Sequence, residues 1–120
     1  MSDPQGSLIL LVEDEPDILL TTELLLKNAG YEVLVASHPA MALDLLEEAR
    51  PRVIITDYMM PWMDGRAFTE QLKTNPGTRE IPVILVSAVT TGPGPWDASL
   101  RKPVEYDQLF GTIERLLRRA

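Results

Sequence analysis

Five polar side chains stand at or just after the ends of apolar runs, in an order that suits phosphoryl transfer. Three are carboxylates, Glu13, Asp14 and Asp57, and the other two are Ser87 and Lys102. A carboxylate that attacks a phosphoryl group must overcome anion–anion repulsion, so a metal ion and a lysine ammonium near the transferring oxygens are the expected help. Carboxylates that converge repel one another unless a cation lies among them, and oxygen ligands suit a hard ion. The pattern therefore favours Mg2+, with Mn2+ or Ca2+ as physical substitutes.

The segments that must position these side chains alternate between short apolar runs and amphipathic stretches of helix length. This alternation predicts a doubly wound α/β fold, in which helices cover both faces of a parallel sheet. Ligands of such folds gather beyond the carboxyl ends of the strands, where the polar side chains would lie. We expect the strands at Leu8–Val12, Tyr31–Ala36, Val53–Asp57, Val83–Ser87 and Ala98–Arg101.

Four helices are expected between and after these strands. The first begins near Pro16 and stops at Gly30, with Ile18, Leu25 and Ala29 at helical spacing. The other three begin at Pro39 behind Ser37 or His38 as cap, after Asp64-Gly65, and near Tyr106.

Length and composition narrow the classes of protein. A chain of 120 residues is the size of one domain, and without cysteine it has neither disulfides nor thiolate metal sites. The net charge of −7 argues against direct nucleic-acid binding. The longest apolar run is far too short to span a membrane, and no signal peptide is recognisable, so we expect a cytoplasmic protein with no membrane partner. Met1–Ser7 reads as a disordered lead-in, and residues 8–120 as the domain.

From Leu8 to Leu117 the sequence resembles the response-regulator receiver domains of two-component (phosphorelay) signal transduction. The motifs that carry the resemblance are Glu13-Asp14, the run from Asp57 to Gly65, Ser87-Ala88 and Lys102-Pro103. The resemblance implies a flavodoxin-like fold with strand order 2-1-3-4-5. It also implies a signalling module that assists its own phosphorylation and dephosphorylation, and not an enzyme that turns over an external substrate.

The resemblance assigns a role to each residue. Asp57 would be the phosphoacceptor, and Glu13, Asp14, Asp57 and the backbone carbonyl of Met59 would hold Mg2+. Ser87 and Lys102 would bind the phosphoryl group, and the peptide bond from Lys102 to Pro103 would be cis. The implied donor is a phosphohistidine on a sensor histidine kinase or a histidine phosphotransfer protein, and the output would pass to an output domain or partner protein.

The segment between Ser87 and Lys102 departs from the family pattern. Its fourteen residues are too few for a full fourth helix and a fifth strand, and residues 92–95, Gly-Pro-Gly-Pro, would break a helix. We predict that the fourth helix is absent or reduced to one turn and that Thr90–Asp97 is a loop. The usual aromatic position three residues before the lysine holds Ser99, so the usual aromatic switch is not expected, and Trp96 is a candidate substitute.

Several other interpretations stay open. The chain could be a pseudo-receiver, an interaction module that works without phosphorylation. A phosphatase similar to the haloacid dehalogenase-like enzymes would need a second aspartate where Met59 stands, and a flavin carrier would need a phosphate-cradling loop after the first strand. Asp64 is interpreted as a helix cap and not a metal ligand, and His38 as a cap or surface residue.

Overall fold

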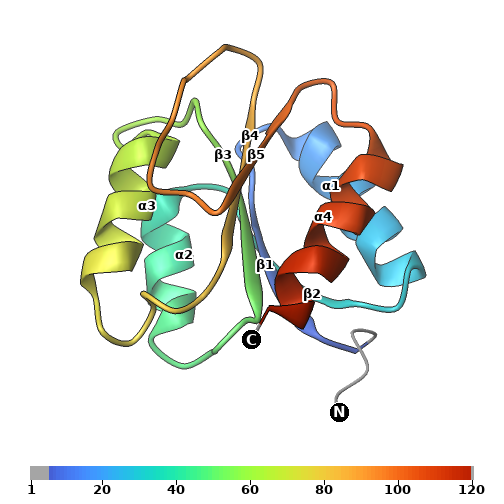
Figure 1. The fold of residues 1–120 in the computed structure, drawn as a ribbon, viewed down its shortest axis with the longest axis horizontal. Helices are drawn as coiled ribbons and strands as arrows, with labels where there is room; N and C mark the ends of the chain where they lie inside the picture. The colour runs from blue at the N-terminus through green and yellow to red at the C-terminus, as the bar shows by residue number, and fades with distance from the viewer. Residues whose placement is uncertain (1–5, 120) are drawn as a thin grey trace.

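The computed structural model describes residues 6–119 and has one parallel sheet with the strand order β2-β1-β3-β4-β5 (Figure 1). This confirms the predicted doubly wound architecture. The strand predicted to begin at Tyr31 begins one residue later, because the Tyr31 N–H donates to the carbonyl of Leu26 at the end of the preceding helix. The strands are β1 Leu8–Val12, β2 Glu32–Ala36, β3 Val53–Asp57, β4 Val83–Ser87 and β5 Ala98–Arg101.

Four helices cover the two faces of the sheet. In Figure 1, α2 and α3 lie on one side and α1 and α4 on the other. Each face has its own buried cluster: Phe68 and Leu72 of α3 pack in one, and Leu109 and Ile113 of α4 in the other. The central strands β3 and β4 are buried along their whole length, as strands covered on both faces must be. The helices are α1 Pro16–Asn28, α2 Pro39–Leu46, α3 Gly65–Thr74 and α4 Tyr106–Arg118.

Side-chain caps begin two of the helices at the predicted places. His38 Nδ1 accepts from the N–H of Met41 at 3.2 Å, and Asp64 Oδ1 accepts from the N–H of Ala67 at 2.9 Å. Each contact satisfies a first-turn donor that has no partner inside its helix. The interpretation of both residues as caps is confirmed.

The buried face of α1 is centred differently from the predicted one. Ile18, Leu25 and Ala29 are only partly buried, whereas Thr22 and Leu26 are fully buried. The spacing of apolar residues does not identify Thr22 as buried, because Thr22 is polar. Its hydroxyl shares a 3.1 Å hydrogen bond with the hydroxyl of Tyr106 on α4. The bond lets a polar residue lie at the centre of the buried stripe.

The crossover from β4 to β5, residues 88–97, is a loop without a helix, as predicted. Arg66 on α3 holds this loop: its Nη2 donates to the carbonyl of Pro93 at 3.0 Å, and its guanidinium carbon lies 4.9 Å from the centre of the Trp96 ring. A Cβ on Gly94 would come within 2.3 Å of that ring, so the loop packs directly on Trp96. An arginine–tryptophan contact thus links the crossover loop to α3.

Residues 1–5 and 120 lie outside the described part of the chain, so the predicted lead-in is described only at Gly6 and Ser7. The Gly6 N–H donates to the Gly30 carbonyl at 2.7 Å, and the Ser7 carbonyl accepts from the Glu32 N–H at 3.0 Å. Within residues 6–119, no helix has both the length and the apolar character that crossing a bilayer requires.

Candidate functional site

Three carboxylates meet at the carboxyl edge of the sheet, where the sequence places them. Glu13 and Asp14 follow β1, and Asp57 is the last residue of β3. One oxygen from each lies within 4.8 Å of the others. The parallel register of β1 and β3 produces this convergence, because it pairs Val12 with Thr56 and so brings both strands to an end side by side.

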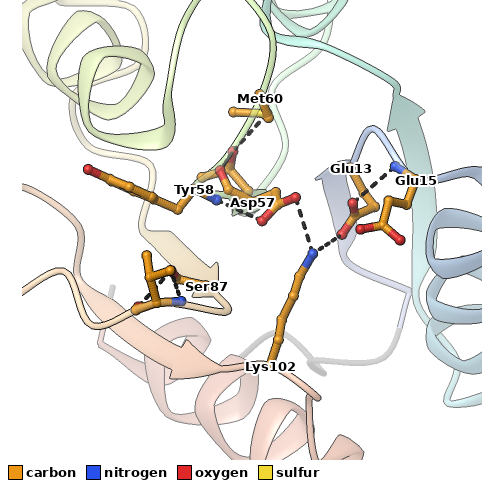
Figure 2. A network of polar contacts seen from close by, with 9 residues as sticks. Glu13, Glu15, Asp57, Tyr58, Met60, Ser87 and Lys102 are labelled. Carbon is orange, nitrogen blue, oxygen red and sulfur yellow. Dashed lines mark hydrogen bonds and ion pairs between the residues drawn. The ribbon is translucent and has the colours of Figure 1, made fainter.

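Lys102 joins two of these carboxylates (Figure 2). Its Nζ lies 3.0 Å from Glu13 Oε1 and 3.1 Å from Asp57 Oδ2, and its side chain is only 15% exposed. Lys102 follows β5, the edge strand, so three different strand ends contribute to one group of charges. The peptide bond from Lys102 to Pro103 is cis, as the family resemblance implied.

Backbone N–H groups orient both buried carboxylates. Asp57 Oδ1 accepts from the N–H of Tyr58 at 2.9 Å, and Glu13 Oε2 accepts from the N–H of Glu15 at 3.1 Å. The loop after Asp57 then turns back, and the Gly65 N–H donates to the Tyr58 carbonyl at 2.7 Å. A Cβ on Gly65 would lie 2.7 Å from the Asp57 carbonyl oxygen, so only glycine allows α3 to begin this close to the site.

Burial and charge shift the protonation equilibria here. Burial is the largest cause that raises the pKa of Glu13, and the negative charge of Asp57 adds to it; against the opposing effects of the Glu15 N–H and Lys102, the pKa rises from 4.5 to about 7. Burial lowers the pKa of Lys102, but hydrogen bonds to Glu13 and Asp57 outweigh it and leave that pKa raised. The ammonium therefore stays charged at neutral pH.

Ser87 lies at the end of β4, where the sequence predicts it, but it is engaged with its own loop. Its hydroxyl donates to the Val89 carbonyl at 2.8 Å and accepts from the Val89 N–H at 3.0 Å (Figure 2). Among the described residues, no hydrogen bond joins Ser87 to Asp57. Met59 lies two residues after Asp57 and is 61% exposed, and the role of its carbonyl stays a prediction.

The donor set fits a hard divalent cation. Glu13, Asp14 and Asp57 offer only oxygen atoms, and Lys102 supplies one positive charge against three carboxylates. Asp64 caps α3 and does not belong to this group. Within the described residues, the carboxylates that converge here are therefore these three. A second cation at this edge would relieve the remaining repulsion.

Sequence reasoning missed the link between the site and the crossover loop. Tyr58, whose N–H binds Asp57, meets Trp96 edge-on with ring centres 6.5 Å apart. Trp96 in turn stacks with Arg66. The three residues lie in different segments, and no short-range pattern in the sequence signals that they meet.

Residues 9–94 match the family model of the response regulator receiver domain. The chain belongs to the response regulator receiver family. The match ends within the crossover loop, before β5 and Lys102. The receiver is a signalling module of two-component systems and not a substrate-turnover enzyme.

Known proteins agree with this assignment. The chain is 31% identical to the response regulator Rre1 of a Synechocystis species over 122 residues, which cover 92% of this chain and 52% of Rre1. The chain thus spans about half the length of that relative. Its fold is similar to the signal receiver domain of a histidine kinase from Syntrophus aciditrophicus, with a TM-score of 0.90 and 31% identity, covering 96% of this chain and 92% of that one.

A receiver domain of a sensor histidine kinase from Pseudomonas aeruginosa is also similar, with a TM-score of 0.85, 26% identity, and coverage of 93% of this chain and 98% of that one. That structure is described with a magnesium ion coordinated in its active site cleft.

Proposed function

We propose that Asp57 of this receiver accepts a phosphoryl group from a phosphohistidine donor, with Mg2+, and that the modified domain changes its interaction surface. The donor would be a sensor histidine kinase or a histidine phosphotransfer protein, and the receiver would assist both its phosphorylation and the later hydrolysis. The observation that carries the proposal is the position of Lys102, whose ammonium reaches Asp57 and Glu13 at once.

Asp57 is placed to act as the nucleophile. Its carboxylate is 6% exposed, and contacts to the Tyr58 N–H and Lys102 fix its orientation. In the reaction a P–O bond to Asp57 forms while the P–N bond of the donor breaks, and the imidazole leaves. Lys102 would lower the repulsion between the incoming phosphoryl oxygens and the carboxylates, because its charge lies among them.

The residues that would hold Mg2+ are Glu13, Asp14, Asp57 and the carbonyl of Met59. When bound, the ion supplies positive charge that neutralises both the carboxylates and the phosphoryl oxygens. Support comes from the all-oxygen donor set and from the magnesium reported in the related Pseudomonas structure.

Ser87 would connect the phosphoryl group to the loop that replaces the fourth helix. To donate its hydroxyl hydrogen to a phosphoryl oxygen, Ser87 must release the Val89 carbonyl. That change loosens the first turn of the loop, whose other end is held by Trp96 and Arg66. We therefore place the phosphorylation-dependent surface change in residues 88–97.

A pseudo-receiver is the second candidate, and one observation favours it. Lys102 already pairs with two of the three carboxylates, and burial favours a protonated Glu13, so the acidic edge could persist without metal. In that case the domain would present one constant surface to its partner.

The domain bounds, the cellular location and the output partner complete the proposed function. We propose residues 8–120 as the receiver domain, with residues 1–7 as its lead-in. We propose the cytoplasm as its location, because kinase and phosphotransfer donors would have to reach Asp57 there. We propose that an output domain or a partner protein reads the phosphorylated state. This domain itself would contact neither nucleic acid nor membrane.

The test is intact mass after incubation with phosphoramidate, with and without Mg2+. Wild type should gain one phosphoryl group only with Mg2+, and Asp57→Asn should gain none. Asp64→Asn is the matched control, since Asn caps a helix as well as Asp, and it should behave as wild type. No gain in wild type would favour the pseudo-receiver.

A further inference from the structure

A cavity of about 470 Å3 lies at the end of the sheet opposite the acidic residues. It is bounded by the segments that lead into β3, β4 and β5 and by the final residues of α3 and α4. No residue proposed for phosphoryl transfer lines it. The phosphorylation chemistry therefore does not account for its composition.

Basic side chains gather in this cavity although the chain as a whole is acidic. Four of the chain's eleven Lys and Arg residues line it, together with two acidic residues, in a protein of net charge −7. The lining thus carries an excess of two positive charges. The basic residues are Arg52, Lys73, Arg79 and Arg119, and the acidic ones are Glu80 and Asp97.

One ion pair in the lining is structural. Asp97 Oδ2 accepts from Lys73 Nζ at 2.9 Å and from the Val83 N–H at 2.8 Å, and both charged side chains are about three-quarters buried. Lys73 also donates to the carbonyl of Ile81 at 3.0 Å. These contacts join α3 to the starts of β4 and β5, so Lys73 and Asp97 neutralise each other.

Arg79 and Arg119 have weaker partners. Arg119 lies 3.9 Å from Asp97, which Lys73 already neutralises, and Arg79 lies 3.8 Å from Glu80, whose side chain is 91% exposed. Each of these long ion pairs involves an exposed arginine side chain, and such pairs contribute little. A positive charge at Arg119 has a structural explanation, because it lies at the negative end of the α4 dipole. The same explanation does not apply to Arg79, which lies in the loop before β4.

We infer that this cavity binds a small organic phosphate, with its phosphate group on Arg79 and Arg119. Guanidinium groups bind phosphate oxygens through paired hydrogen bonds, which suits a dianion. The volume lies within the range of small-molecule sites, and an apolar wall is available for the organic part of the ligand. The net charge of the chain disfavours a long polyanion such as RNA. The apolar wall consists of Pro51, Ile81, Pro82, Leu116 and Leu117.

The experiment is an NMR titration of the 15N-labelled protein with AMP, without Mg2+ so that the acidic site takes no part. AMP should cause saturable shifts at the amides around Arg79 and Arg119 and leave those around Asp57 unchanged. Adenosine, which lacks the phosphate, should cause no saturable shift. Inorganic phosphate should bind at the same amides about tenfold more weakly than AMP, since it lacks contacts with the apolar wall.

Two double variants distinguish AMP binding at a defined site from nonspecific electrostatic attraction. Arg79→Gln with Arg119→Gln should weaken AMP binding by about tenfold or more. Arg115→Gln with Arg118→Gln removes the same charge from α4 outside the cavity and should leave binding within about twofold of wild type, because exposed charges are screened. Equal weakening by both pairs, shifts that do not saturate, or inorganic phosphate binding as tightly as AMP would overturn the inference.

Discussion

Lys102 Nζ lies 3.0 Å from Glu13 Oε1, although the two residues are 89 positions apart in the chain. The contact places a cation inside the group of carboxylates that we propose as the metal ligands. Lys102 and a bound metal ion would therefore share one task, which is to reduce repulsion among Glu13, Asp14 and Asp57.

Replacing Lys102 by methionine should make the domain depend more on Mg2+. Lys102→Met keeps the apolar stem but leaves buried carboxylates without their ammonium partner, which should lower metal-free stability by about 3 kcal/mol. Thermal unfolding should show a larger stabilisation by Mg2+ in this variant than in wild type. Lys27→Met removes an i,i+4 pair between Glu23 and a lysine whose side chain is exposed; it is the control and should change little. If Mg2+ stabilises wild type and Lys102→Met equally, Lys102 and the metal ion do not both reduce the repulsion among the carboxylates.

The raised pKa of Glu13 predicts opposite pH trends with and without metal. The stability that a protonated Glu13 contributes is complete below its ordinary pKa of 4.5 and is lost as the pH rises through about 7. Mg2+ needs the ionised carboxylate, so its affinity should rise over the same interval. Unfolding temperatures measured in EDTA and in Mg2+ from about pH 5 to pH 8 would reveal both trends. Glu13→Gln cannot titrate, and if its profiles match those of wild type, the assignment to Glu13 is wrong.

Trp62 should be replaceable by glycine with a gain in stability. Its φ of 66° lies in the left-handed region, and the residue is 94% exposed, so strain is present without compensating burial. Relief of about 1–2 kcal/mol of strain, less the entropy cost of glycine, leaves a net gain of up to about 1 kcal/mol for Trp62→Gly. Trp62→Ala keeps the strain and serves as the reference. Urea unfolding should rank glycine above alanine, and the reverse order would refute the strain.

Trp96 should report phosphorylation through its fluorescence. In a Trp62→Phe background, Trp96 is the only tryptophan, and it contacts both Tyr58 and Arg66. If Ser87 releases Val89 to bind the phosphoryl group, the loop and the surroundings of Trp96 should change. Phosphoramidate with Mg2+ should then shift or quench the emission.

The same addition should leave the emission of Trp62→Phe with Asp57→Asn unchanged. An unaltered spectrum in a protein that mass spectrometry shows to be phosphorylated would mean that the loop does not respond.

The sequence was sufficient to predict the strands and the convergence of the acidic residues, because apolar runs and parallel topology determine where strand ends lie. The run of Gly and Pro in residues 92–95 likewise predicted the missing helix. Contacts between distant segments could not be predicted. The Thr22–Tyr106 hydrogen bond and the Arg66–Trp96 stacking depend on side-chain packing between elements, which leaves no periodic trace in the sequence.

Chemical trapping of the modified residue tests the central claim most directly. Borohydride reduces an acyl phosphate to an alcohol, so reduction after incubation with phosphoramidate and Mg2+ should convert Asp57 to homoserine, which peptide mass spectrometry can locate. The account predicts this conversion at position 57 alone, and only with Mg2+. Conversion at Glu13 or Asp14, or a phosphoryl group on His38, would contradict it.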